Sequence, residues 1–205
     1  MGFLKGFTRV VDAISEVLGW IIMILVMATV ALTFYNVVVR YLGEFIGRQL
    51  SSNTYLELQT TFFSLVFLLG FAYILKHGVN VRVDFIYTNW PLKRKAMLDF
   101  WGHLFFLVPF CILGIWVTVG PVLTSWGKLH NDPLLPPAAW SGSIEWSSNP
   151  GGLPLAPLKS MIIVGFFLLL LQTLAELIKL WGVMTGHLEM VEAKGMETDS
   201  PLRVE

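Results

Sequence analysis

Residues 68–95, LLGFAYILKHGVNVRVDFIYTNWPLKRK, determine how the rest of the chain is arranged. One apolar segment ends near Leu75 and another begins near Met97, and five of the fourteen Lys and Arg residues lie between them, from Lys76 to Lys95. Basic residues in short loops between membrane spans are retained on the cytoplasmic side. The stretch therefore predicts a cytoplasmic loop between two transmembrane helices.

The composition agrees with a membrane protein. The chain has 205 residues, of which 55% are hydrophobic and 14% charged, and its mean hydropathy is +0.68. These values lie on the apolar side of ordinary globular domains. The net charge is zero and no basic block exceeds Lys93-Arg94-Lys95, so no nucleic-acid partner is indicated. The single cysteine, Cys111, excludes an intrachain disulfide and a thiolate metal cluster.

The N-terminal residues 1–17 are expected to form an amphipathic helix that lies on the membrane surface. Apolar residues recur there at helical spacing, with charged residues opposite them, as is typical of interfacial helices. A first span is predicted at residues 18–39, which contain no charge. Its 22 residues would measure about 33 Å as a helix, enough to cross the hydrocarbon core. The apolar positions of the amphipathic helix are Phe3, Phe7, Val10, Ile14 and Val17.

Three further spans complete an all-α integral membrane protein with four transmembrane helices. They are expected at about residues 54–75, 97–119 and 158–181, and Pro109 predicts a kink in the third. The segment 120–157 holds seven of the ten prolines and is expected to be an external loop. Residues 18–182 thus form the membrane domain, and 183–205 a polar cytoplasmic tail. This topology places ten Lys and Arg residues inside and four outside, which favours two cytoplasmic termini.

Few ionisable residues in the predicted spans could carry chemistry. Asp99 and His103 lie four positions apart on one helix face, and they could form either a proton relay or a local pair at the membrane surface. His77 and His103 could ligate haem through facing imidazoles, although their predicted depths differ. The sequence contains no Walker motif and no metal-binding motif, so we expect no cofactor, no metal and no enzymatic activity.

Glu57 and Gln59 open the second predicted span and are expected near the external face. They could contact a transported solute, but positions two apart on a helix point in different directions. Such residues more often form hydrogen bonds between helices or between subunits. We therefore interpret Glu57 and Gln59 as polar packing residues.

The order of elements resembles the small membrane subunit, the DctQ type, of tripartite ATP-independent periplasmic (TRAP) transporters, over roughly residues 10–185. The large external loop is similar to that of the branch with longer small subunits. Glu57 is followed by Gln59 where the family usually has paired acids, and Asn80 stands where it usually has histidine. The motifs that carry the resemblance are NVVVRY at 36–41, ELQ at 57–59, LGFAY at 69–73 and VRVD at 81–84.

The resemblance implies a scaffold role in the bacterial inner membrane. In this family the large membrane subunit holds the substrate and ion sites, and a periplasmic binding protein delivers the solute. The small subunit then supports the large one in ion-gradient-driven uptake of an organic acid or related small solute, with lipid filling the seam between them. The resemblance also assigns Arg40 and Arg82 to lipid or subunit contacts and Asp84 to holding the cytoplasmic turn; for charged residues near a membrane surface, snorkelling to the headgroups is the alternative.

Two other classes of function remain open at this stage. The alternative hypothesis is a redox membrane anchor that binds haem through His103. The third is a stand-alone membrane enzyme that uses Asp99 and His103.

Overall fold

The computed structural model describes residues 2–48, 50–78, 90–127, 144–149 and 152–185. Their secondary structure is helical apart from one isolated β-bridge between Trp146 and Pro154. This confirms the predicted all-α class. The helices are α1 (Gly2–Ile46), α2 (Asn53–His77), α4 (Leu92–Gly102), η1 (His103–Leu107), α5 (Val108–Ser125) and α6 (Leu155–Thr185).

Among the described residues, four helical segments are long and apolar enough to cross a membrane. Their outward surfaces carry many exposed aromatic and aliphatic side chains, such as Phe34, Phe106 and Trp116. Such surfaces are expected of helices that face lipid or a membrane partner. The four segments are Leu4–Ile46, Asn53–His77, Lys93–Ser125 and Leu155–Thr185, and they confirm the predicted four-span architecture.

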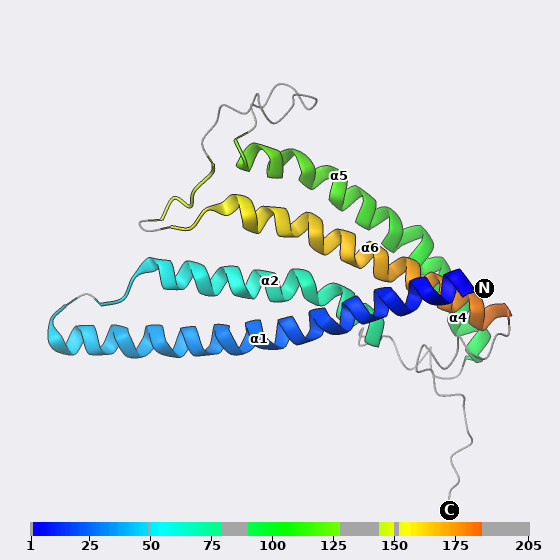
Figure 1. Cartoon of the computed structure of the whole chain (residues 1–205), viewed down its shortest axis with the longest axis horizontal. Helices are drawn as coiled ribbons and strands as arrows, with labels where there is room; N and C mark the ends of the chain where they lie inside the picture. The colour runs from blue at the N-terminus through cyan, green and yellow to red at the C-terminus, as the bar shows by residue number, and fades with distance from the viewer. Residues whose placement is uncertain (1, 49, 79–89, 128–143, 150–151, 186–205) are drawn as a thin grey trace, which may run out of the picture.

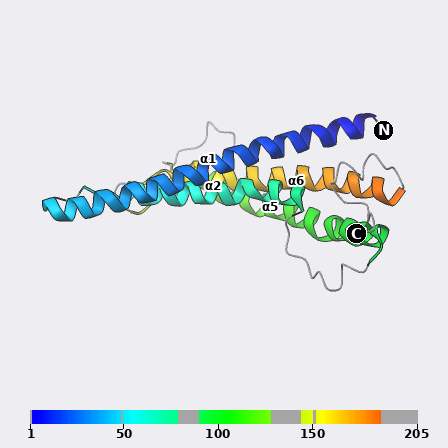
Figure 2. The same cartoon turned by 90° about the horizontal axis from the view of Figure 1, so that it is seen from below.

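The helices form two hairpins that touch along α2 and α6 (Figure 1). We call the end with the 47–52 turn and the start of α6 the loop end, and the end with the chain's N-terminus the terminal end. The hairpins α1–α2 and α5–α6 diverge toward the loop end and converge toward the terminal end. Seen from below, α1 crosses α2 and continues beside α6 (Figure 2).

Two glycines bring helices into close contact. A Cβ added to Gly165 of α6 would lie 3.0 Å from the carbonyl oxygen of Leu68 in α2, and one added to Gly114 of α5 would lie 2.7 Å from the Phe166 ring. Small residues at such positions let helix backbones approach in a membrane, where packing rather than the hydrophobic effect drives association. Gly165 therefore sets the distance between the two hairpins.

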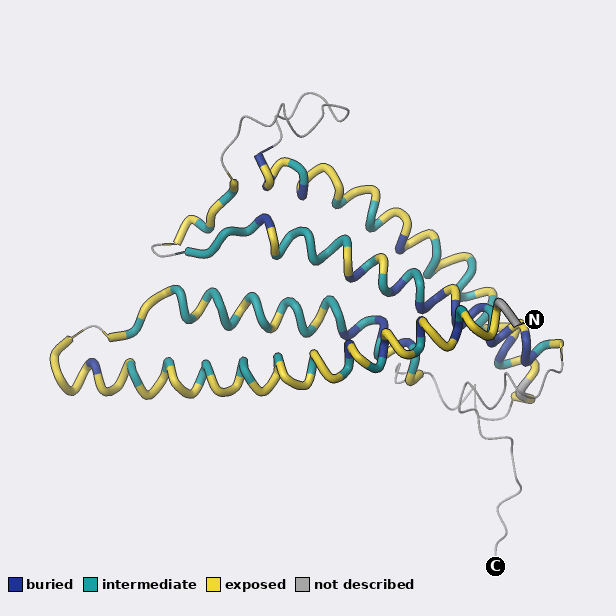
Figure 3. Tube along the Cα trace, in the orientation of Figure 1, coloured by how far each residue is buried: buried dark blue, intermediate teal, exposed yellow. Residues whose placement is uncertain are grey.

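Helix α6 is the centre of the bundle. It contacts α1, α2, α4 and α5, and the buried positions of the molecule concentrate along its second half (Figure 3). Cys111 of α5 is fully buried against Leu75 of α2 and Leu169 of α6, as a small apolar residue. At the terminal end, Ala96 of α4 packs against Leu180 of α6.

The third span, in which the sequence predicts a kink at Pro109, departs from regular α-helix geometry just before this proline. The turn just before it is a π-helix, in which the Val108 N–H donates to the carbonyl of His103, five residues earlier. Pro109 itself has no N–H to donate to the preceding turn. Helix α5 then continues through Pro121 to Ser125, six residues past the expected end of the span at residue 119.

The sequence predicts a separate surface helix in the N-terminal segment, whereas in the structure this segment is part of a longer helix. Residues 2–46 form one unbroken helix, whose 45 residues measure about 67 Å at 1.5 Å per residue. Ser15 and Val11 are buried, whereas the apolar Val10 and Val17 are exposed at the surface. Asp12 and Ser15 of this segment are bonded to polar side chains of α6.

Gly165→Leu should destabilise the bundle, because its side chain cannot fit against the α2 backbone at Leu68. Overpacking of this kind costs about 1–3 kcal/mol, so thermal unfolding in detergent should begin several degrees lower. The matched control is Gly120→Leu, since a Cβ at Gly120 meets nothing within 4 Å. Equal melting of the two variants would show that Gly165 does not set the hairpin distance.

Candidate functional site

Polar side chains join the helices at both ends of the bundle. At the terminal end, five residues form what we call the terminal-end cluster. They lie on one face of α1 and one face of α6, the latter at positions i, i+4 and i+7 of the helix. The cluster consists of Asp12, Ser15, Gln172, Glu176 and Lys179.

Hydrogen bonds in the terminal-end cluster link α1 to α6 directly. Lys179 Nζ donates to Asp12 Oδ1 at 2.8 Å and to Glu176 Oε1 at 3.0 Å. Ser15 Oγ donates to Gln172 Oε1 at 2.7 Å. The Gln172 amide in turn donates to Asp12 Oδ1 at 3.2 Å and to Glu176 Oε1 at 3.4 Å.

The cluster lies in the protein interior. The side chains of Lys179 and Glu176 are 2% and 3% exposed, whereas that of Asp12 is 20% exposed. A buried charge without a partner is strongly unfavourable, and pairing with full hydrogen bonding offsets that penalty. The single ammonium lies between two carboxylates, so removing Lys179 leaves both acids without their cationic partner.

A second group beside the cluster attaches α2. Lys76 Nζ donates to Glu16 Oε1 at 2.5 Å and to the backbone oxygen of Asp12 at 3.0 Å. His77 Nε2 lies 3.1 Å from the same Glu16 oxygen, and its ring packs against Tyr73. The contacts of α1 with Lys76 and Lys179 thus tie three helices together at the terminal end.

At the loop end, Glu57 of α2 holds the segment before α6. Its carboxylate accepts hydrogen bonds from Ser147 Oγ, from Asn149 Nδ2 at 2.9 Å and from the backbone N–H of Leu153 at 2.5 Å. The segment is closed on itself by a bond from the Ser147 N–H to the Leu153 carbonyl, 3.0 Å long. Glu57 is therefore engaged within the chain.

Glu145 fixes the same segment to α5 and α6. Its carboxylate oxygen Oε2 accepts from Lys159 Nζ and from Ser125 Oγ, each at 2.6 Å. The Glu145 backbone also bonds to Ser125 and to Leu155. The Lys159 ammonium, and then the Ser125 hydroxyl, hold the pKa of the Glu145 carboxyl below its ordinary value. Residues 144–149 and 152–154 are thus held by contacts with α2, α5 and α6.

The five residues that the sequence assigns to a subunit or lipid interface lie in different environments. Arg40 is exposed on α1, and Gln59 is half-buried two positions beyond Glu57. Arg82 and Asp84 lie outside the described residues. Glu57 is thus the one of the five whose hydrogen-bond partners are identified, and these partners are all in the connection to α6.

Of the candidate chemical residues, His77 contacts Glu16 beside the terminal-end cluster, whereas Asp99 and His103 belong to the third span and not to that cluster. Asp99 and His103 line one open hollow of about 380 Å³ together with Trp101 and Phe105. In the described part of the chain, no three His, Cys, Asp or Glu side chains are placed to hold a metal ion.

Sequence reasoning missed the terminal-end cluster. Asp12 and Ser15 belong to the segment that the sequence predicts as a separate surface helix, and the predicted last span assigns no role to Gln172, Glu176 and Lys179. The i, i+4, i+7 spacing of the latter three was a signal of one shared polar face. It does not, however, reveal which distant segment of the chain meets that face.

Four apolar spans cross-linked by polar contacts at their ends define a multi-pass membrane protein. The family model for the DctQ component of tripartite ATP-independent periplasmic transporters matches residues 29–182. The chain belongs to this family, and is accordingly a small permease subunit of an inner-membrane TRAP transporter. The family is a transporter component and not an enzyme family; its members function with a large membrane subunit and a periplasmic binding protein. Comparisons with curated proteins and with solved structures returned no match.

Lys179→Met should destabilise the protein strongly, because Asp12 and Glu176 then face each other without the ammonium between them. Breaking a buried ion pair in this way costs about 3–5 kcal/mol. Thermal unfolding measures the loss, and Lys93→Met, at an exposed position of α4, is the control. The triple variant Asp12→Asn, Glu176→Gln, Lys179→Met should recover much of it; no recovery would contradict the electrostatic explanation.

Lowering the pH should break the Glu145 contacts at the loop end only below the pH range in which an ordinary carboxyl group titrates. Because the folded pKa of Glu145 is lowered, its contribution is fully present above the unfolded pKa and is lost as pH falls through the folded one. Hydrogen–deuterium exchange of residues 144–149, corrected for the intrinsic pH dependence, should rise only in that acidic window. Glu145→Gln should exchange faster at neutral pH and show a smaller acid step, because Glu57 still holds Ser147 and Asn149; a step near neutral pH would contradict the assignment.

Proposed function

We propose that this subunit is a rigid scaffold that supports the large membrane subunit during uptake. The transported compound is an organic acid or related small solute. A periplasmic binding protein delivers it, and an ion gradient drives its uptake. The observation that carries the proposal is the mutual pairing of buried charges between helices at the terminal end. Charges satisfied within the chain suit a frame, whereas a transport path presents its polar groups to a cavity.

The orientation in the membrane is part of the proposal. The basic segment between α2 and α4 and the majority of Lys and Arg residues favour a cytoplasmic terminal end, with both chain termini inside. The Glu57 and Glu145 contacts then lie at the periplasmic face. There they would hold the connection between α5 and α6 still while the binding protein and the large subunit work beside it.

The same scaffold role and orientation give each predicted interface residue a function. Arg40 is exposed on α1, where its guanidinium can reach lipid phosphates or the large subunit. Glu57 and Gln59 support the interface from within by keeping the periplasmic end ordered. Arg82 and Asp84 act at the cytoplasmic turn, and membrane lipid fills the seam between the two subunits.

Arg82→Ala and Asp84→Asn should each lower solute uptake by weakening assembly with the large subunit. The measurement is co-purification of the two subunits from mild detergent, followed by uptake into proteoliposomes with the binding protein and a sodium gradient. Arg94→Ala, exposed at the start of α4, is the matched control. Normal co-purification with normal uptake in both variants would refute the assigned interface.

A further inference from the structure

Helix α1 carries an exposed apolar stripe whose length matches a lipid bilayer, and we call it the short stripe. It starts at Trp20 and advances by alternating steps of three and four residues to Tyr41, and all its side chains are exposed. From Trp20 to Tyr41 it measures about 31 Å, close to the hydrocarbon core of about 30 Å. The next step leads to Glu16 at one end and to Glu44 at the other. A stripe that ends in aromatic residues and then in charges is typical of a surface that faces lipid.

A second apolar stripe of α1, the long stripe, lies beside the first. It starts at Val10 and advances by alternating steps of four and three residues to Phe45. Between Trp20 and Leu42 each of its positions directly follows a position of the short stripe, so the two stripes are about 100° apart around the helix. All members of the long stripe are aliphatic or aromatic. The side chains at its two ends, Val10 and Phe45, are 60% and 91% exposed.

Lipid can cover the long stripe only in part. From Val10 to Phe45 it measures about 52 Å, and it runs past Trp20 by about 15 Å toward the terminal end. Helix α1 is unbroken there, so this part continues along the direction of the span, beside α6 (Figure 2). Fitting the whole stripe into a core of about 30 Å would need a tilt of about 55°, beyond the limit of about 40° for membrane helices. A protein partner can cover the full length of the stripe.

The residues of the long stripe suit close packing against another helix. Ala28 and Ala31 lie at its centre, and small residues let two helices approach closely within a membrane. Most of the other positions are Val or Ile, whose branched side chains are already stiff before they pack. The short stripe has the flexible Met23 and Met27 in this region instead. A partner that crosses the membrane here is itself helical, because its backbone polar groups must be satisfied internally.

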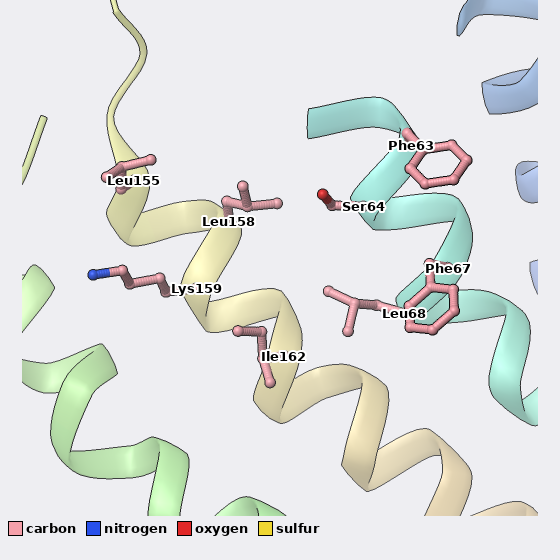
Figure 4. Close-up of a pocket in the computed structure, with 8 residues that line it drawn as sticks. All are labelled: Phe63, Ser64, Phe67, Leu68, Leu155, Leu158, Lys159 and Ile162. Atoms are coloured by element: carbon pink, nitrogen blue, oxygen red, sulfur yellow. The ribbon is translucent and has the colours of Figure 1, made fainter. Parts of the chain in front are cut away.

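A groove between α2 and α6 is another apolar recess that could receive a partner (Figure 4). It has a volume of about 370 Å³, and Ser64 of α2 and Leu158 of α6 lie on its two sides. Along α6 its lining extends from Leu155 to Ile162, which is about 10 Å of helix. A membrane-spanning helix is about three times longer than this. The groove can therefore take single side chains, but it does not match a whole span.

We propose that the long stripe of α1 is the surface on which an apolar helix of the large membrane subunit docks. The proposal rests on the scaffold function and names the surface through which that function acts. The partner helix lies along α1 and continues beyond the span at the terminal end, and its closest approach is at Ala28 and Ala31. Lipid covers the neighbouring short stripe. Because the pair of Asp12 and Lys179 ties α1 to α6, the docked helix is connected to the whole bundle.

The test is site-specific photo-cross-linking in the assembled transporter, with an affinity tag on the large subunit that identifies it. The photoreactive residue p-benzoylphenylalanine replaces Ile24 or Val38 of the long stripe. The matched controls carry it at Met23 or Val37, the directly preceding positions on the short stripe, which are also exposed. The tagged large subunit should be cross-linked from Ile24 and Val38 and not from Met23 or Val37.

A substitution tests the same surface without a cross-linker. Ala31→Trp places a large ring at the centre of the long stripe. It should weaken co-purification of the large subunit at least about fivefold, because the two helices can no longer approach closely. Val30→Trp, one position away on the short stripe, should co-purify like the wild type. Both side chains are exposed, so the two isolated variants should unfold at the wild-type temperature.

Several results would overturn the proposal. Normal co-purification of Ala31→Trp is one, and cross-linking between two copies of this chain at Ile24 is another. Cross-linking of the large subunit only from Met23 and Val37, or only from Ser64 in the groove, would place it on a different surface and leave the scaffold function standing. Failure of the wild type to co-purify with the large subunit would overturn the scaffold function, and this inference with it.

Discussion

The structure depends on one constraint: a charge enclosed by apolar helices must find its partners inside the protein. Lys179 meets this condition between Asp12 and Glu176, and its two ion pairs bridge α1 and α6. Because α6 contacts each of the other long helices, fixing α1 to it fixes the terminal end as a whole. A buried pair of this kind adds little net stability by itself, but it penalises every arrangement that separates its members. It thus specifies one packing of the N-terminal segment.

At the loop end, charged groups that lie nearer the protein surface also find their partners within the chain. Glu57 and Glu145 each gather several donors from a segment that is otherwise irregular. Between the two polar ends, glycines at 114 and 165 permit close helix contacts, and the remaining surface is apolar. The molecule is therefore constrained at both ends and in the middle. This arrangement suits a subunit that must keep its shape beside a moving partner.

The sequence was sufficient for the architecture, because a bilayer demands long uncharged runs and these are visible in the chain. A disturbance of the helix at Pro109 was expected for a similar local reason, since proline lacks the N–H that a regular helix requires, but the π-helical turn at His103–Leu107 was not. Polar contacts between distant segments were not predictable. Glu57 was recognised as a polar residue near an external loop, but its bonds to Asn149 and Leu153 join residues more than ninety positions apart. Local spacing carries no information about such partners.

The N-terminal segment illustrates the same limit. An amphipathic pattern shows that a helix has a polar and an apolar face, but it does not say whether water or another helix meets the polar one. In the structure Gln172 and Lys179 take that place. The apolar positions Val10 and Val17 are consequently left on the surface, where lipid or a partner subunit can cover them.

The measurement that tests the rigid-frame account most directly is the distance between the N-terminal part of α1 and the end of α6 in the assembled transporter. Spin labels at Arg9→Cys and Thr185→Cys occupy exposed positions, and the native Cys111 is buried. Double electron–electron resonance should give one narrow distance distribution, unchanged by solute or by the ion gradient. A broad distribution, or one that shifts during transport, would contradict a fixed frame held by the terminal-end cluster.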